Sequence, residues 1–405
     1  MFKKNKFFAL SLLSVLIATT AQAQDKPNQY VVVAPLCLTK NITSHFLTLS
    51  QTKKFSLIKV DDNGLNQLIH AKDHQKVICG GFMNVTDAWL NTKLKGKLSA
   101  NPFLQNYITA KPITQKTLTS HYTITHSKEV NQLLAQINPQ LMWGNLTTLT
   151  NFSDRYANSD TGLQAANWIK SQVEKMVKDN QRTDVSITLV STGSSYKQPS
   201  VVVKIGDSTE PAVVVGAHMD TLSTFWGNMP GADDDGTGAV TVLEVARTLL
   251  SSNLHFQKPI YLIWYSAEEE GLVGSQHVVA EFKKQNIAVS DVIHFDMTGY
   301  APKNDTTMWL ITDNTNKDLT SYLEELINSY VKKPVKYTAC GYACSDHATW
   351  TANGYKAAIA FEAAFESYNP YIHSGEDKMS LISLDHMTDF TKLAVAFATE
   401  LGNPI

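Results

Sequence analysis

Apolar segments of strand length alternate with segments of helical spacing through most of the chain. Strands are expected at 185–190, 200–205, 212–216, 259–266, 292–296, 308–312 and 357–361, and helices at 129–137, 141–149, 161–178, 238–250, 273–285, 319–331 and 384–401. This alternation indicates an α/β protein in which the centre of the sheet is parallel. We therefore expect a mixed, largely parallel sheet that is sandwiched by helices.

Polar side chains of the kinds that bind ligands stand where these apolar strands end. The segments are GAHMD (216–220), GADDDGTG (231–238), SAEEE (266–270), HFD (294–296) and NPYIH (369–373). Each segment alone has an ordinary explanation, such as a solvated loop or a helix start favoured by the helix dipole. Because ligands bind beyond the carboxyl ends of the strands in such sheets, their joint placement favours a shared site.

The mixture of acids and histidines points to divalent metal ions. Asp233, Asp234 and Asp235 are adjacent, and their mutual repulsion raises their pKa values unless a cation lies among them. Imidazole and carboxylate without thiolate suit Zn²⁺, whereas carboxylates alone would suggest Mg²⁺ or Ca²⁺. A carboxylate can bridge two metals roughly 3.5–4 Å apart. The number of acids therefore favours a hydrolytic site with two metals.

The first residues predict export. Three lysines among the first six residues precede an apolar run at 7–18, and Ala21-Gln22-Ala23 supplies a small-residue cleavage pattern. These features are typical of a secretory signal peptide at 1–23. The apolar run is too short to cross a membrane, which takes roughly 20 residues. We expect a secreted, extracellular protein, with the periplasm as one route, and no membrane association after cleavage.

Export makes disulfide bonds the expected state of the four cysteines. Cys37 and Cys79 both lie in the N-terminal region, whereas Cys340 and Cys344 are close together near the other end. The simplest pairing is Cys37–Cys79 and Cys340–Cys344, which is one of three connectivities. A zinc half-site is the alternative for the second pair.

The region from 24 to 111 differs from the rest. We expect strands at 30–38 and 55–60, a short helix at 65–70 and a junction near 111–114. A small α+β region between a signal peptide and a main domain is typical of a prosegment that assists folding and covers the active site. A structural appendage is the alternative. The predicted division is a signal peptide (1–23), a prosegment (24–111) and a catalytic domain (112–405).

Six segments resemble, in order, those of the secreted bacterial leucyl aminopeptidases. They are GAHMD (216–220), PGADDDGTG (230–238), YSAEEEGLVGSQ (265–276), HFDMTGY (294–300), CGYACSDHATW (340–350) and YNPYIHSGED (368–377). The resemblance runs from about residue 112 to the C-terminus. It implies a zinc exopeptidase fold, two zinc ions per chain and hydrolysis of the first peptide bond of peptides or proteins that have a free N-terminus.

The resemblance also implies roles for single residues. The metal ligands would be His218, Asp234, Glu269, Asp296 and His373. Asp234 would bridge the two zinc ions, with Glu269 and His373 on one ion and His218 and Asp296 on the other.

Three further positions match the family around these ligands. Asp220 matches an acid that orients the imidazole of His218, and Glu268 matches the general base. Tyr342 matches a tyrosine that can hydrogen-bond the substrate carbonyl oxygen, and it lies inside a short disulfide loop closed by Cys340 and Cys344. The mechanism implied is attack by a hydroxide that bridges the two zinc ions.

The expected side-chain pocket is apolar. The positions that match the family's pocket are Met297, Cys340, Tyr342, Cys344, Ile359, Phe361, Phe365 and Tyr368. Such a pocket favours N-terminal Leu and other large hydrophobic residues, because a Lys or Arg would lose its hydration without gaining a partner. Glu362 or Glu366 would change this preference if either pointed inward.

Composition and the ligand set exclude or weaken other functions. Lys and Arg number 35 against 37 Asp and Glu, a net charge of −2, so nucleic-acid binding is not expected. We expect a monomer. The alternatives kept are a Lys- or Arg-preferring aminopeptidase, a glutaminyl cyclase with a single zinc, and a non-catalytic binding domain on the same scaffold.

Overall fold

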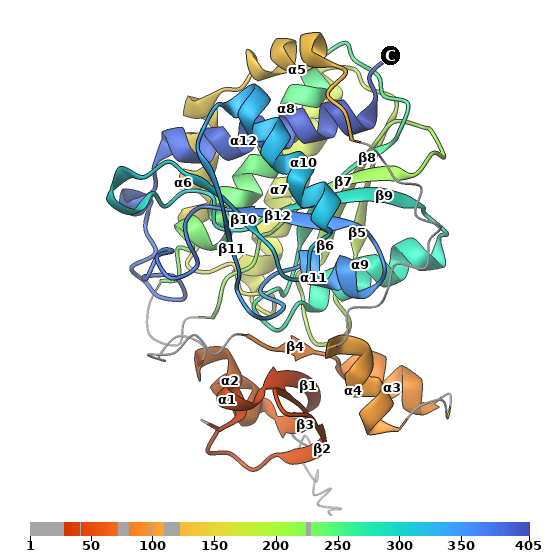
Figure 1. The fold of residues 1–405 in the computed structure, drawn as a ribbon, viewed down its shortest axis with the longest axis vertical. Coiled ribbons are helices and arrows are strands. Elements are labelled where there is room, and N and C mark those ends of the chain that lie inside the picture. Colours follow the sequence, from red (N-terminus) through yellow and green to blue (C-terminus); the bar gives the residue numbers. More distant parts are fainter. Residues whose placement is uncertain are drawn as a thin grey trace, which may run out of the picture.

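A computed structural model of the chain describes residues 28–40, 42–71, 81–94, 96, 99–108, 122–223 and 228–405. These residues form an N-terminal unit (28–108) and a larger main domain (122–405), which Figure 1 shows one below the other. The predicted signal peptide and most of the predicted junction lie outside the described residues. The proposed division of the chain therefore stays a prediction.

The N-terminal unit is a small antiparallel sheet with helices. Its strand order is β2-β3-β1-β4. Its elements are β1 (Gln29–Pro35), α1 (Leu36–Thr39), β2 (Leu47–Gln51), β3 (Phe55–Asp61), α2 (Asp62–Ala71), β4 (Met83–Asn84), α3 (Thr86–Leu94) and α4 (Ala100–Ile108). The strand expected at 30–38 is thus shorter, because the chain turns into α1 after Pro35.

The main domain contains an eight-stranded sheet in the order β11-β10-β12-β9-β7-β8-β6-β5. Its strands are β5 (Val185–Val190), β6 (Ser200–Ile205), β7 (Ala212–His218), β8 (Ile260–Tyr265), β9 (Val289–Phe295), β10 (Met308–Ile311), β11 (Val335–Thr338) and β12 (Ala357–Phe361). The four central strands β12, β9, β7 and β8 are parallel to their neighbours in that group. The predicted mixed, largely parallel sheet is therefore confirmed.

Helices cover both faces of this sheet. They are α5 (Ser127–Leu134), α6 (Pro139–Thr150), α7 (Asp160–Asp179), α8 (Gly238–Ser251), α9 (Val273–Lys284), α10 (Lys317–Leu326), α11 (His347–Ala352) and α12 (Leu384–Gly402). Val213 and Val215 of β7 face the core that α8 and α12 share, whereas Val214 faces Val278 of α9 and Trp350 of α11. Because both faces are buried, the central strands read as continuous apolar runs in the sequence.

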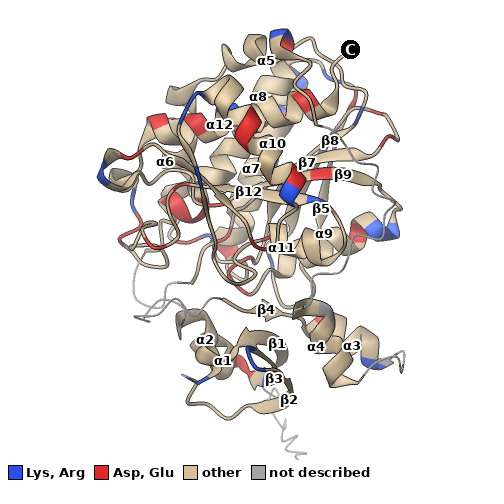
Figure 2. Cartoon of the chain, in the orientation of Figure 1, with Lys and Arg blue, Asp and Glu red and all other residues tan. Residues whose placement is uncertain are grey.

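The N-terminal unit packs against the main domain at the end of the sheet where the parallel strands finish. Leu222 and Met229, which follow β7, belong to one apolar cluster of the N-terminal unit. Leu272, which follows β8, belongs to its second cluster. Figure 2 shows several acidic residues in the loops of the main domain that lie toward this unit. No helix among the described residues is both long and apolar enough to cross a membrane.

Candidate metal centre and active site

The five predicted metal ligands come together at the carboxyl end of the parallel strands. His218 is the last residue of β7, Asp296 follows β9 directly, and Glu269 lies in the turn after β8. Asp234 precedes α8, and His373 lies in the segment after β12. They form two groups, one of His218, Asp234 and Asp296 and the other of Asp234, Glu269 and His373, and the ligand atoms in each group lie within 4.8 Å of one another.

Asp234 belongs to both groups through different oxygen atoms. Its Oδ1 lies 3.0 Å from Nε2 of His218 and its Oδ2 lies 3.0 Å from Nε2 of His373. Oε2 of Glu269 is 3.1 Å from the same nitrogen of His373. Oδ1 of Asp296 is 3.6 Å from Nε2 of His218. A carboxylate that faces two separate groups in this way has the arrangement that a bridging ligand needs.

The neighbours of Asp234 in the acid triplet, Asp233 and Asp235, bind backbone N–H groups of nearby loops. Asp235 accepts hydrogen bonds from the backbone N–H groups of Gly238 at 2.9 Å and Met297 at 3.1 Å. Asp233 accepts one from the backbone N–H of Gly299 at 3.0 Å. Neither belongs to a group of candidate ligands among the described residues. The two outer acids therefore fix the loops around the site, and of the triplet only Asp234 belongs to the groups of candidate ligands among the described residues.

A fourth acid, Asp377, fixes the backbone at Asp234. Its carboxylate accepts hydrogen bonds from the backbone N–H groups of Asp233 and Asp234. The amide of Asn369 donates to both Asp233 and Asp377. Burial and the charge of Asp233 raise the pKa of Asp377 to about 8. These contacts hold the segment after β12 against the loop that carries Asp234.

Asp220 joins the histidine to the turn that follows β8. Its Oδ1 lies 3.4 Å from Nδ1 of His218. The same carboxylate accepts hydrogen bonds from the backbone N–H groups of Glu268 at 3.0 Å and Glu269 at 3.2 Å. One buried side chain thus sets the position of an imidazole and of two carboxylate-bearing residues together.

The centre has the electrostatics of a cation site. Burial lowers the pKa of His218, but the carboxylates of Asp220, Asp234 and Asp296 outweigh burial and raise that pKa well above its usual value. Burial raises the pKa of Asp234, but the hydrogen bonds to His218 and His373 hold it well below its usual range. A raised histidine pKa beside a lowered carboxyl pKa arises where several acids surround a position that favours positive charge.

Sequence reasoning missed Arg155, which is fully buried. Its guanidinium donates to the carbonyl oxygen of Met219 at 2.8 Å, between His218 and Asp220 in the chain. It also donates to the carbonyl oxygens of Pro230 at 2.6 Å and Gly231 at 2.8 Å, in the loop that leads to Asp234. One side chain therefore ties two ligand-bearing segments together.

Glu268 and Tyr342 lie on one small cavity beside the centre. The cavity has a volume of about 30 Å³ and is lined by both residues together with Glu269. Gly81 and Phe82 of the N-terminal unit line it as well. Cys340 and Cys344, on either side of Tyr342 in the chain, form the predicted disulfide. The second predicted disulfide, Cys37–Cys79, stays a prediction because Cys79 lies outside the described residues.

The predicted pocket residues form one apolar cluster. Its buried members are Met297, Ile311, Cys340, Ile359, Phe361 and Phe365, and Trp309, Tyr342, Cys344, Tyr368 and Ile372 pack against them. Ile311, Trp309 and Ile372 are additions that sequence reasoning missed. Glu362 is turned away, because its carboxylate accepts from the backbone N–H groups of Tyr300 and Asn369. Glu366 is exposed.

Comparison with known proteins agrees with this geometry. The profile of Peptidase family M28 matches residues 200–398. A probable leucine aminopeptidase of Trichophyton verrucosum (strain HKI 0517) is 33% identical over 332 residues, 78% of this chain and 88% of that protein. The crystal structure of the LapA aminopeptidase of Legionella pneumophila is 45% identical with a TM-score of 0.85, and the match covers 93% of this chain and 99% of that chain.

A second structure from Legionella pneumophila, that of LapB, is 38% identical with a TM-score of 0.85, and the match covers 93% of this chain and 100% of that chain. The sheet, the two groups of histidine and carboxylate side chains and these likenesses define a metal-dependent hydrolase of peptides. The chain belongs to peptidase family M28 and is a metallo-aminopeptidase.

We expect Arg155→Met to weaken metal binding and to lower the free energy of unfolding. Each buried carbonyl oxygen that loses its donor costs about 1–3 kcal/mol, and loss of support around metal ligands lowers metal affinity about 10–100-fold. Zinc affinity is measured by competition with a chromophoric chelator, and stability by thermal denaturation.

Arg182→Met is the matched control. Arg182 also donates to a backbone carbonyl, that of Leu249, and forms an ion pair with Asp184, but neither partner is a candidate metal ligand. This variant should lose stability and keep its zinc affinity. Unchanged zinc affinity in Arg155→Met would limit Arg155 to a stabilising role.

Proposed function

We propose that this metallo-aminopeptidase is a secreted enzyme that uses two zinc ions to remove Leu and other large hydrophobic residues from the N-terminus of peptides. The observation that carries the proposal is the position of Asp234, whose two oxygens face His218 and His373 separately at 3.0 Å. A carboxylate shared in this way favours two metals over one.

The donor set suits zinc. His218 and Asp296 would hold one ion, Glu269 and His373 the other, and Asp234 both. Oδ1 of Asp296 is buried and has no hydrogen-bond partner among the described residues, as a coordinating oxygen would require. Imidazole and carboxylate are zinc ligands in catalytic sites. When bound, the metal supplies Lewis-acid activation of water and of the substrate carbonyl.

Glu268 is the proposed general base. Its side chain lines the cavity next to Glu269, and its backbone N–H is fixed by Asp220. The Glu268 carboxylate would take a proton from the attacking water and return it to the amine that leaves. Tyr342 lines the same cavity, and its hydroxyl would donate a hydrogen bond to the carbonyl oxygen as negative charge develops there.

The apolar cluster around Met297 and Phe365 is the proposed pocket for the N-terminal side chain. Burial of a Leu or Phe side chain contributes about 1.5–3 kcal/mol. Glu362 and Glu366, the acids nearest in sequence, do not enter the cluster. A Lys side chain would therefore lose hydration without a partner. This arrangement supports a preference for Leu, Phe and Met.

The function is tested by assaying leucyl, lysyl and glutaminyl substrates before and after chelator treatment and after zinc is added back. We expect leucine to be released at least about ten times more efficiently than lysine, since 1.4 kcal/mol corresponds to a factor of ten. Chelation should abolish release, and elemental analysis should find two zinc ions per active chain.

Each alternative has its own outcome in this experiment. A preference for lysine would keep the chemistry and refute the proposed pocket. Pyroglutamate formation with one zinc ion per chain would indicate a glutaminyl cyclase. No turnover by a chain that holds two zinc ions would indicate a binding domain.

Glu268→Gln should keep both zinc ions and lower kcat by at least ~10²-fold, the usual contribution of a general base. The change keeps the size of the side chain and removes the proton acceptor. Glu366→Gln is the control, because Glu366 is exposed, and it should retain full activity. Near-normal turnover by Glu268→Gln would remove Glu268 from this role.

We further propose that the N-terminal unit is a prosegment that covers the active site. Gly81 and Phe82 line the cavity that holds Glu268 and Tyr342. The backbone N–H of Asn84 donates to the carbonyl oxygen of Gly271 at 3.0 Å, three residues after Glu268. These contacts leave a volume of only about 30 Å³ beside the centre, far less than a drug-sized ligand occupies.

Polar contacts hold this cover in place at its flank. The side-chain amide of Gln276 donates to the carbonyl oxygen of Asn84 at 3.0 Å. Oδ2 of Asp87 lies 3.1 Å from Nε2 of His277, and this hydrogen bond lowers the pKa of Asp87. Both contacts join the N-terminal unit to α9, directly after the turn that carries Glu268.

A specific protease site introduced between residues 108 and 122 tests the cover. We expect low activity on leucyl substrates before cleavage and a rise after cleavage and separation of the N-terminal unit. Return of the separated unit should lower the activity again. The original chain, treated with the same protease, is the control. Equal activity before and after cleavage would make the N-terminal unit a structural appendage.

A further inference from the structure

The segment that carries Tyr342 has no regular secondary structure from residue 339 to residue 346. Gly341 has a φ of +81°, a conformation that favours glycine. Tyr342 itself is half-buried, and its ring meets that of Phe365 with centroids 6.0 Å apart. The disulfide joins Cys340 to Cys344 but leaves the peptide groups between them to be fixed by other contacts.

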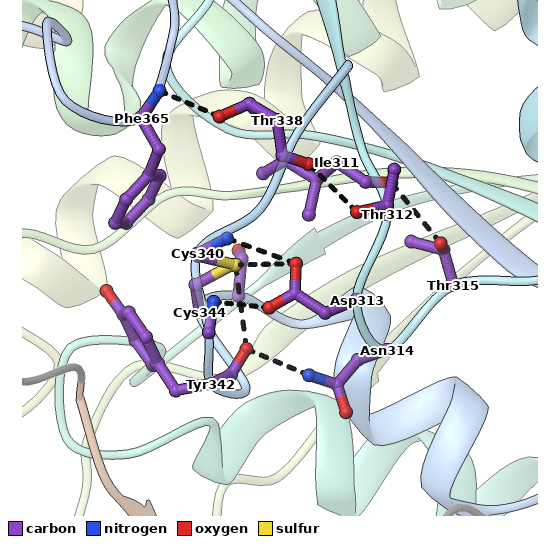
Figure 3. Close-up of a disulfide and its surroundings, with 12 residues drawn as sticks. Ile311, Thr312, Asp313, Asn314, Thr315, Thr338, Cys340, Tyr342, Cys344 and Phe365 are labelled. Atoms are coloured by element: carbon purple, nitrogen blue, oxygen red, sulfur yellow. Dashed lines mark hydrogen bonds between the residues drawn. A yellow bond between two sulfur atoms is a disulfide. The ribbon is translucent and has the colours of Figure 1, made fainter.

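Two adjacent side chains, Asp313 and Asn314, supply those contacts (Figure 3). The Asp313 carboxylate accepts hydrogen bonds from the backbone N–H of Cys340, at 3.0 Å, and from that of Gly341. The side-chain amide of Asn314 donates to the carbonyl oxygen of Tyr342 at 2.8 Å. The backbone is therefore held on both sides of the Tyr342 side chain.

Asp313 and Asn314 stand on a well-supported turn. The turn joins β10 to α10, and the side chain of Asn316 caps α10 by accepting from the backbone N–H of Leu319. The hydroxyl of Thr351 in α11 donates to the carbonyl oxygen of Asn314 at 2.7 Å. The backbone N–H of Thr312 donates to the carbonyl oxygen of Thr338 at 3.0 Å. The sheet and two helices thus set where the Tyr342 loop is held.

We propose that Asp313 and Asn314 are positioning residues. They hold the Tyr342 loop so that the hydroxyl of Tyr342 lies within hydrogen-bonding distance of the substrate carbonyl oxygen in the transition state. This inference rests on the proposed function, in which Tyr342 donates that hydrogen bond. A carboxylate that accepts from two N–H groups forms stronger hydrogen bonds than a neutral acceptor. Displacement of a catalytic group by about 1 Å can lower the rate about 10²-fold.

The proposal is tested with Asp313→Ala, Asn314→Ala, Tyr342→Phe and the double variant Asp313→Ala/Tyr342→Phe. All are made in the full chain and assayed on a leucyl substrate after the cleavage described above. We expect each single variant to lower kcat about 10–100-fold, with KM changed less than about threefold. The double variant should be no slower than Tyr342→Phe alone, because Asp313 acts through the hydroxyl that Tyr342→Phe has already removed.

The outcomes separate the two proposals. If the losses of Asp313→Ala and Tyr342→Phe multiply, Asp313 does not act through Tyr342 and the positioning role fails, while the role of Tyr342 stands. If Tyr342→Phe keeps the original kcat, both roles fail. Elemental analysis should find unchanged zinc in every variant, and loss of zinc from Asp313→Ala would also overturn the positioning role.

Two further variants protect the test against general misfolding. Asp313→Asn keeps the volume and one acceptor oxygen, so we expect a kcat between those of the original chain and Asp313→Ala. Asp305→Ala is the matched control, because Asp305 precedes the same strand β10 and accepts from the backbone N–H of Thr307 at 3.0 Å. It should keep the original kcat, and an equal loss in Asp305→Ala would assign the effect to strand stability.

Discussion

The guanidinium of Arg155 is the interaction on which the architecture of the centre depends. This one cation binds carbonyl oxygens from both the segment after β7 and the loop before α8. A buried carbonyl oxygen without a hydrogen-bond donor costs free energy, and Arg155 supplies that donor to both segments. Burial lowers the pKa of Arg155, while the charges of Asp377 and Asp235 oppose that shift. The same side chain thus offsets part of the negative charge that the acids bring into the protein interior.

The acids of the centre divide into those that face the ligand position and those that hold the backbone. Asp220, Asp235 and Asp377 accept backbone N–H groups from segments that lie far apart in the chain. Asp234 is thereby left with both oxygens directed at histidines. Burial of so many carboxyl groups costs free energy, and this burial raises the pKa of Asp233 to about 6. A cation at the centre would offset that cost.

Much of this arrangement could be predicted from the sequence, and the rest could not for definite reasons. Strands β5 and β6 have the predicted bounds, because their apolar runs end at turn-forming residues. The helix expected at 319–331 is instead the α-helix α10 followed by a short π-helix at Ile327–Val331. Strand β11 was missed because it is short and largely exposed.

The candidate ligands stood out in the sequence as charged residues at the ends of apolar runs. Arg155 did not, because its partners are carbonyl oxygens, which every residue carries.

The contact between the N-terminal unit and the Tyr342 ring involves a residue without a side chain. A Cβ atom on Gly81 would lie 3.1 Å from the ring of Tyr342, so the backbone comes close to that ring. On the opposite wall, a Cβ on Gly271 would come within 2.6 Å of the backbone nitrogen of Asn84. A side chain at Gly81 would make the Tyr342 ring or the N-terminal unit shift by a few tenths of an ångström, without altering a residue of the main domain. If the N-terminal unit covers the active site as proposed, a change at this one position of the unit would alter how closely it covers the centre, while the residues of the centre and of the pocket stay as they are.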